Sequence, residues 1–443
     1  MQRSDINKNI LRLAIPSIVN NITVPLLGLC DTAVSGHLGS GVYLGAIAVG
    51  AMAVNSIFWI LGFLRMGTTG LTAQAQGAGD SSQTHLLFTQ ALLLAVSLGL
   101  LLIMLHQPLG KLIMGIISPE EEVRELASGY FNTVIFGAPA MLSTMVISGW
   151  FLGMQTSVQP MVIAISTNVL NILLSLLFAF GLGMGFIGTA WGTFAAQWAG
   201  LLIALFLLRR FKGGRIPLAP IKPVLIRRGW GRFVNVNVYI FFRSFCIIAV
   251  TMAVTSIGAS LGTAVLAANA VIMQFFHIFS YFMDGFAFAG EALAGKAVGA
   301  KDRRMLDSSS LHLSLWGLGV TTLFILIYMT CGTSLSTLIT DDAGTLLMVS
   351  QFQVWLWLPA LCGAPAFICD GIFIGLTATR AMFVSTLLGL AGFSLAMWCL
   401  PVGGNNGLWL AFVIYLCLRG VYLMARYASA SNAAFTALSF KLK

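Results

Sequence analysis

A small set of ionisable side chains lies within stretches of the sequence that are otherwise apolar. They are Asp31, Arg65, Arg243, Asp284, Glu291, Asp370 and Arg419. A charge is costly inside a bilayer, so each one kept there is either a candidate functional group or a member of a structural ion pair. A carboxylate whose pKa is raised by desolvation can load and release a proton as its exposure changes. The chemistry that these residues suggest is therefore proton or cation coupling.

Asp31 is the strongest candidate for a protonation site. At helical spacing it shares a face with Ser17 and Asn20, and such a polar face should look into a bundle or a water-filled cavity. Pro16 and Pro25 interrupt the hydrogen bonding of the same segment, so we expect a kink that frees a carbonyl beneath the acid. We predict a coupling role for Asp31. The alternatives are a solvent-exposed helix end and a hydrogen-bonded structural acid.

Amide and hydroxyl side chains line one face of the apolar segment 160–181. Asn168, Asn171 and Ser175 are three and four residues apart, and Thr193 lies in the next apolar segment. Hydrogen bonding between helices is the commoner role of such residues in membranes, and spacing alone favours it over a site for a coupling ion.

Three charges of the second half lie at a similar depth. Arg243, Asp284 and Asp370 are each ten to twelve residues from a basic residue near the end of their segment, which corresponds to about 15 to 18 Å of helix. Pairing of Arg243 with either acid would avoid isolated charges, and the pair could serve architecture, gating or coordination of a substrate or ion. Glu291 and Arg419 lie nearer the end, where we expect solvated or snorkelling side chains.

Composition indicates the scaffold that holds these residues. The 443-residue chain is 58% hydrophobic and 9% charged, with a mean hydropathy of +0.92, whereas globular chains are about a quarter charged. Twelve continuous apolar segments approach or exceed the roughly 20 residues that a transmembrane helix needs. They are 10–36, 43–75, 85–105, 126–152, 160–181, 187–208, 233–258, 264–295, 306–338, 345–375, 382–401 and 407–428. Continuous runs exclude a transmembrane β-barrel, whose strands alternate in hydrophobicity.

The apolar skeleton is repeated about 222 residues along the chain. Residues 38–40 (LGS) are echoed by 261–263 (LGT), and 77–80 (GAGD) by 299–302 (GAKD). Such duplications are typical of transporters whose two halves rock about a central site. We therefore predict an all-α integral membrane protein with twelve transmembrane helices, arranged as two six-helix bundles around a central cavity.

Basic residues predict the orientation. Between 209 and 232 lie eight basic residues and no acidic one, whereas acidic residues occur near 120–125 and 341–342, in alternate loops. Loops rich in Lys and Arg stay in the cytoplasm. This predicts an N-lobe of residues 1–208, a basic cytoplasmic linker of 209–232 and a C-lobe of 233–443. We expect a multi-pass protein of the inner membrane, with both termini cytoplasmic.

Other classes of protein fit the sequence poorly. It contains no phosphate-binding loop with a lysine and no His and carboxylate cluster with the spacing of metal ligands, and its cysteines are scattered through apolar runs. The formal charge of +10 marks loops at the membrane and not a nucleic-acid site. We expect no enzyme activity, no metal, and no cofactor other than H⁺ or Na⁺ as the coupling ion. We also expect a monomer in the lipid bilayer.

Several strings of residues resemble the multidrug and toxic compound extrusion (MATE) family, and in particular its DinF-like subgroup. They lie in order along nearly the full chain, at 21–39, 64–74, 284–287, 370–375 and 407–411. The resemblance implies two six-helix lobes around a cavity that opens alternately to each side. It also implies export of amphipathic, often cationic compounds in exchange for H⁺ or Na⁺.

The resemblance also assigns roles in the N-lobe. It implies that Asp31 is protonated and that Asn171 accompanies it, together with an acid four residues later that this chain replaces by Ser175. Because one carboxylate is missing, the resemblance favours protonation of Asp31, supported by Asn171 and Thr193, over a cation site made of two acids.

In the C-lobe, Asp284 and Asp370 match acids of the subgroup, so a contribution of these acids and Arg243 to coupling or substrate binding stays open. The expected function is cation-coupled multidrug export, with H⁺ favoured. The alternatives are Na⁺-coupled export and a flippase of an amphipathic lipid-linked precursor. The internal repeat and the acid-bearing, proline-containing segment argue against a channel or a scaffold.

Overall fold

A computed structural model describes residues 3–36, 41–211, 216–220, 224, 230–399 and 403–439, and these contain helices and no strand. The side chains of part of the first helix, Asp31 among them, lie outside the described residues.

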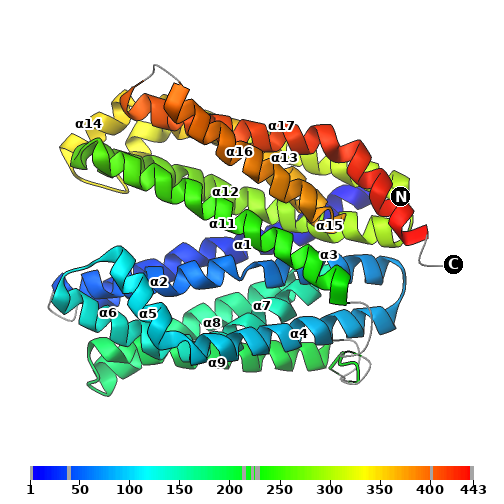
Figure 1. The fold of residues 1–443 in the computed structure, drawn as a ribbon, viewed down its shortest axis with the longest axis horizontal. Helices are drawn as coiled ribbons and strands as arrows, with labels where there is room; N and C mark the ends of the chain where they lie inside the picture. The colour runs from blue at the N-terminus through cyan, green and yellow to red at the C-terminus, as the bar shows by residue number, and fades with distance from the viewer. Residues whose placement is uncertain are drawn as a thin grey trace. The chain divides into compact units, whose positions relative to one another are not determined.

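The first half of the chain contains α1 (Arg3–Gly36), α2 (Gly41–Ile60), α3 (Phe63–Gly77), α4 (Ser81–Met104), α5 (His106–Ile117), α6 (Glu121–Val134), the 3₁₀ turn η1 (Ile135–Gly137), α7 (Ala138–Gly153), α8 (Val158–Leu176), the π turn η2 (Leu177–Gly181) and α9 (Phe186–Arg210). The second half contains α11 (Trp230–Ser260), α12 (Thr263–Gly299), α13 (Arg303–Ser336), α14 (Ala343–Gln351), α15 (Val354–Gly375), α16 (Thr379–Cys399) and α17 (Gly404–Ser439), as Figure 1 shows.

Eleven helical segments of the described residues are long and apolar enough to cross a membrane. The 34-residue α1 occupies the place of the first predicted span, so the predicted helical membrane fold is confirmed. Two predicted spans are interrupted by residues that are not helical, and a third, 126–152, passes from α6 to α7 through the 3₁₀ turn η1. The span 43–75 divides into α2 and α3 around Gly62, a poor helix former, and 345–375 divides into α14 and α15. The short helix α5 lies outside the predicted spans.

The chain folds into two compact units. Unit 1 comprises Met1–Ile18, Ala73–Gly79 and Arg232–Lys443, and unit 2 comprises Val19–Thr72 and Asp80–Gly231. In unit 1, α15 packs against α12 and α17, and α16 packs against α17; in unit 2, α8 packs against α9, and α4 against α7. The start of α1 and the end of α3 therefore fold with helices of the second half.

The sequence repeat reappears as repeated local geometry. Asp80 and Asp302 each cap the next helix by accepting a hydrogen bond from the backbone N–H three residues on, at 2.9 Å. Gln155 and Thr377 both have a left-handed backbone, with φ of 67° and 55°. Both pairs are 222 positions apart, which places the same turn at the same point of each half.

Within unit 1, the ends of α3 and α12 cross at two equivalent glycines. A Cβ on Gly77 would overlap the carbonyl of Lys296, and a Cβ on Gly299 would overlap the carbonyl of Gln74. Gln74 also donates a hydrogen bond from Nε2 to the carbonyl of Gly375, at 2.8 Å. The absence of side chains at the two glycines therefore lets the two backbones touch.

The aromatic side chains of α12 belong to the core of unit 1. Phe275, Phe279 and Phe286 are buried, and the ring of Phe275 packs edge-on against Tyr328, with centroids 4.9 Å apart. These rings therefore pack against protein and contribute to the core of unit 1.

Candidate functional site

A carboxylate shared by two arginines lies in the core of unit 1. Asp370 on α15 accepts through Oδ2 from Nη2 of Arg243 on α11 and, at 2.7 Å, from Nη2 of Arg419 on α17. The exposed fractions of Asp370, Arg243 and Arg419 are 6%, 6% and 7%. One carboxylate is therefore shared by two guanidinium groups from other helices, away from solvent, and the three groups together carry an excess of positive charge.

Tyr415 completes the surroundings of the second arginine. Nη1 of Arg419 donates to the Tyr415 hydroxyl at 3.1 Å, and the guanidinium lies 5.2 Å from the centre of the same ring. The hydrogen bond and the cation–π contact both stabilise a guanidinium that shares Asp370 with Arg243. Sequence reasoning missed this tyrosine, although its four-residue spacing from Arg419 places both on one helix face.

Three polar atoms of this cluster have no hydrogen-bond partner within the described part of the chain. They are Oδ1 of Asp370, Nε of Arg243 and Nε of Arg419. Buried polar atoms are normally paired, so a cluster with three open positions is one where water or a polar ligand would be stabilised.

The structure separates the predicted charges of the second half. Arg243 is paired with Asp370, whereas Asp284 lies half-buried on α12. Arg419 and Glu291 are buried, with Glu291 1% exposed, so the prediction that they are solvated or snorkelling is wrong. The reason is packing between helices. Arg419 of α17 donates to Asp370 of α15, and a Cβ on Gly375 of α15 would lie 2.7 Å from the carbonyl of Glu291, so α15 covers both positions.

A second polar network joins α8 to α9 in unit 2. Nδ2 of Asn171 donates to Oγ1 of Thr193, and Oγ of Ser175 donates to Oδ1 of Asn171, both at 3.3 Å. Thr193 in turn donates to the carbonyl of Thr189 at 3.0 Å. The structure thus brings Asn171, Ser175 and Thr193 together, and hydrogen bonding between helices is present as the spacing indicated.

Close packing explains why Ser175 fits this network. A Cβ on Gly192 of α9 would lie 2.5 Å from both N and Oγ of Ser175. The side chain of Ser175 is fully buried. An aspartate at this position would need more room than the contact leaves, which is consistent with the departure from the family pattern here.

The face of α8 that carries Asn171 and Ser175 also contacts α1 through Asn168. Nδ2 of Asn168 donates to the carbonyl of Thr23 at 3.3 Å. The helix α1 continues through Pro16 and Pro25 from Arg3 to Gly36. Asp31 lies eight residues beyond Thr23 in this helix, with a side chain outside the described residues.

Comparison with known proteins identifies the family. The MatE family model matches residues 16–177 and 240–398. The chain is 38% identical over 424 residues to DNA damage-inducible protein F of Escherichia coli (strain K12), covering 95% of this chain and 91% of that protein. It is 24% identical to multidrug resistance protein MdtK of Edwardsiella ictaluri (strain 93-146), covering 95% and 94% of the two chains.

Solved structures show the same fold. An outward-facing multidrug resistance MATE family transporter of the MOP superfamily superposes with a TM-score of 0.86 at 17% identity, covering 98% and 97% of the two chains. A MOP superfamily transporter from Pyrococcus furiosus gives a TM-score of 0.84 at 18% identity, covering 97% and 96%. The family model matches both halves of the repeat, and the helical fold agrees with these structures. The chain therefore belongs to the MatE family of membrane transporters, which are not enzymes.

Proposed function

We propose that the protein is a proton-coupled exporter of amphipathic, cationic compounds that works by alternating access. In this proposal Asp31 is the protonation site, supported by Asn171 and Thr193. Membership of the MatE family supports transport, and several relatives carry the name multidrug resistance protein.

The hydrogen bonds of Asp370 bear on which acid could bind a coupling ion. Oδ2 of this acid already accepts hydrogen bonds from Arg243 and Arg419. A third cation at the same carboxylate would meet a local charge of about +1 at low dielectric, where repulsion is strong. This argues against Na⁺ at Asp370. At the N-lobe, Ser175 stands where a second acid would be needed for a cation site made of two acids, which favours a proton on Asp31.

The register of α1 and α8 supports Asp31 as the protonation site. Figure 1 shows both helices running in the same direction in unit 2, and Thr23 is bonded to Asn168. Ser175 lies seven residues beyond Asn168 and Asp31 eight beyond Thr23, a rise of about 10 to 12 Å in each helix. The backbone of Asp31 is then level with a network whose described members are neutral amides and hydroxyls, so a single acid would supply the charge.

The proposed orientation is that of an inner-membrane protein with cytoplasmic termini. Arg209 and Arg210 lie in the last turn of α9, and Lys301 lies in the turn between α12 and α13. Asp342 begins α14 at the opposite end of α13. Within unit 1, Lys301, Arg303 and Arg304 outnumber Asp302 at one end of α13, and Asp342 lies beyond the other end, which agrees with the positive-inside rule. We propose a monomer as the working unit.

Transport in liposomes tests the proposal. Purified protein is reconstituted, and accumulation of a fluorescent cationic dye is followed under an imposed pH gradient, with and without Na⁺. We expect the wild type to follow the pH gradient and Asp31→Asn to lose this response, whereas the matched control Asp342→Asn, which changes an exposed acid, keeps it.

Each other outcome has a distinct meaning. If the wild type responds to a Na⁺ gradient alone, proton coupling is contradicted and Asp284 becomes the candidate for the Na⁺ site. A wild type that moves dye under neither gradient contradicts cationic export and favours the flippase of an amphipathic precursor. Thermal unfolding of each variant in detergent shows whether a loss of transport reflects loss of the fold.

A further inference from the structure

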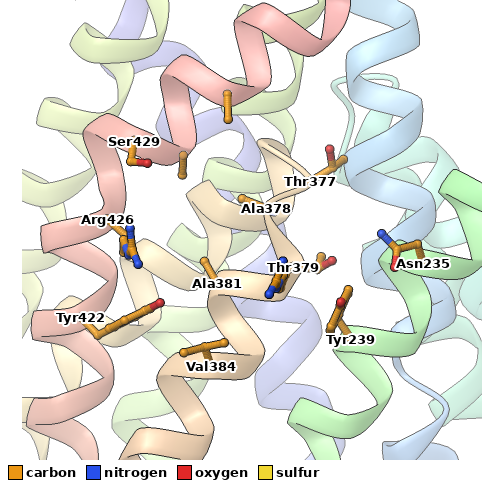
Figure 2. A pocket seen from close by; sticks show the side chains of 13 residues that line it. Asn235, Tyr239, Thr377, Ala378, Thr379, Ala381, Val384, Tyr422, Arg426 and Ser429 are labelled. Atoms are coloured by element: carbon orange, nitrogen blue, oxygen red, sulfur yellow. The ribbon is translucent and has the colours of Figure 1, made fainter.

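A pocket of about 680 Å³ opens between α11, α16 and α17 in unit 1. Figure 2 shows the start of α16 between two groups of side chains: Tyr422 and Arg426 from α17 lie on one side, and Asn235 and Tyr239 from α11 on the other. All of these residues belong to unit 1, and none takes part in the Asp370 cluster. The pocket is therefore separate from the residues to which transport has been assigned.

The charge of the pocket is positive. Its lining includes Arg380 and Arg426 and no acidic side chain. Both arginines are exposed, and neither forms an ion pair with any acid that the structure describes. Arg426 lies over the ring of Tyr422, 5.7 Å from its centre, which leaves the edge of the guanidinium open to a ligand.

Neutral hydrogen-bond donors complement the two arginines. Thr379 begins the 21-residue helix α16 within the lining, so the positive end of this helix dipole adds to the field. The hydroxyls of Tyr239, Tyr422 and Ser429 and the amide of Asn235 supply further donors. Two guanidinium groups with several hydroxyl donors match the oxygens of a phosphate group.

The depth of the pocket places it at the level of lipid headgroups. α17 begins at Gly404 and α16 ends at Cys399, and a helix needs about 20 residues to cross the hydrocarbon core. Arg426 and Arg380 lie 22 and 19 residues from these ends, and Tyr239 lies 21 residues from the end of α11 at Ser260. In each of α11, α16 and α17, the pocket residues therefore lie about as far from the opposite end of the helix as the hydrocarbon core is thick.

We infer that this pocket binds the phosphate headgroup of an anionic phospholipid. Ala381, Val384 and Ala430 also line it, and they offer an apolar wall to the glycerol and upper acyl region, which a free phosphate would not use. Basic pockets between transmembrane helices bind anionic headgroups in this way. In the orientation proposed above, the pocket lies at the cytoplasmic leaflet; the lipid site itself does not depend on that orientation.

Native mass spectrometry of the full chain in detergent tests the inference. Phosphatidylglycerol and phosphatidylcholine with identical acyl chains are titrated, and the bound lipids are counted. We expect the wild type to prefer phosphatidylglycerol and the double variant Arg380→Gln/Arg426→Gln to bind it about 30-fold more weakly, since each basic residue near a membrane surface contributes about five-fold. The matched control Arg209→Gln/Arg210→Gln removes the same charge from exposed positions outside the pocket and should leave the affinity unchanged.

Three further results decide the inference. Arg426→Lys keeps the charge but loses the guanidinium edge, so its affinity should lie between that of the wild type and that of Arg426→Gln, which should lose about five-fold. Inorganic phosphate at millimolar concentration should not displace the lipid; displacement would mean a site for soluble anions and would overturn the inference. Equal phosphatidylglycerol binding by the wild type and by a pocket variant with an unchanged unfolding temperature would also overturn it.

Discussion

Nη2 of Arg419 lies 2.7 Å from Oδ2 of Asp370, the same oxygen to which Arg243 donates. Replacing Asp370 by Asn would leave two buried guanidinium groups without a counter-charge. Breaking a buried ion pair from one side costs about 3 to 5 kcal/mol. We expect Asp370→Asn to lower the free energy of unfolding by this amount, measured by denaturant unfolding in detergent.

The matched control for Asp370 is an exposed acid that also pairs with an arginine. Asp307 accepts from Nε of Arg303 at 3.2 Å, and both side chains are partly exposed. Asp307→Asn should change the free energy of unfolding by less than about 1 kcal/mol. The triple variant Asp370→Asn/Arg243→Gln/Arg419→Gln should recover part of the lost stability. An Asp370→Asn protein as stable as the wild type would contradict the buried cluster.

The contact between α8 and α9 predicts a severe effect of a single methyl group. Gly192→Ala would place a Cβ 2.5 Å from N and Oγ of Ser175, so the helices must separate and the hydrogen bonds of Asn171 must lengthen. Overpacking of this kind costs about 1 to 3 kcal/mol. We expect a lower thermal unfolding midpoint together with weaker pH-driven dye transport.

The control for Gly192 is a glycine with open space around it. A Cβ on Gly115 of α5 would meet nothing within 4 Å. Gly115→Ala should raise the unfolding midpoint slightly, because alanine favours a helix by roughly 1 kcal/mol over glycine. Similar thermal unfolding midpoints for Gly192→Ala and Gly115→Ala would show that α8 and α9 can accommodate a methyl group at Gly192 and would contradict their close packing.

We expect the same kind of destabilisation at the crossing of α3 and α12, where two glycines far apart in the sequence are in close contact with the other helix. A Cβ on Gly77 or on Gly299 would overlap a backbone carbonyl of the other helix. Backbone cannot move aside as a flexible side chain can, so Gly77→Ala and Gly299→Ala should each lower the unfolding midpoint of the protein in detergent. Gly319→Ala in α13, where a Cβ would meet nothing within 4 Å, should not. A midpoint unaffected by all three changes would contradict the crossing.

The N-terminus of α14 predicts a local dependence on pH. The hydroxyl of Thr345 donates to Oδ2 of Asp342 at 2.6 Å and its backbone N–H at 2.7 Å. These hydrogen bonds lower the pKa of Asp342 in the folded state. Because the folded pKa lies below the unfolded value, the stabilisation is complete above the ordinary pKa of an aspartate and is lost as the pH falls through the lowered value.

Hydrogen exchange of the α14 amides measures this effect. Protection in the wild type should exceed that in Asp342→Asn at about pH 6, and the difference should shrink toward about pH 3. The other exposed acid of this loop, Asp341, forms no described cap, so Asp341→Asn should leave the profile unchanged. A difference that is independent of pH would show that the cap does not depend on the charge of Asp342.

Sequence alone predicted the fold because hydropathy and repeated turns are local properties. The repeat was visible at residues 77–80 and 299–302, and the structure shows the same helix cap in each half. The assignment of residues 1–18 and 73–79 to unit 1 was not predicted. This assignment depends on helix backbones that approach each other closely, such as those at Gly77 and Gly299. The hydrophobic periodicity of the sequence does not predict such a contact.

The candidate site was predicted in part for a similar reason. Counting residues from the helix ends put Arg243 level with Asp370, and the two are paired. The same count put Arg419 near the membrane surface, because it could not show that α15 packs against α17 and brings Asp370 to this arginine. Depth along a helix could not show whether Arg243 pairs with Asp284 or with Asp370. That choice depends on which of α12 and α15 presents its acid to Arg243 of α11, and this is visible only in the structure.

The buried cluster has a consequence for synthesis at the ribosome. Arg243 and its acid are 127 residues apart in the chain, and translation at about 5 to 20 residues per second separates them by about 6 to 25 s. For that time α11 carries an uncompensated arginine whose insertion costs about 3 kcal/mol on the biological scale. Arg419 emerges 49 residues after Asp370, so the last helix finds an acid already present. The Asp370 cluster is therefore completed in steps during synthesis, with α11 made first, α15 bringing the carboxylate and α17 adding the second arginine last.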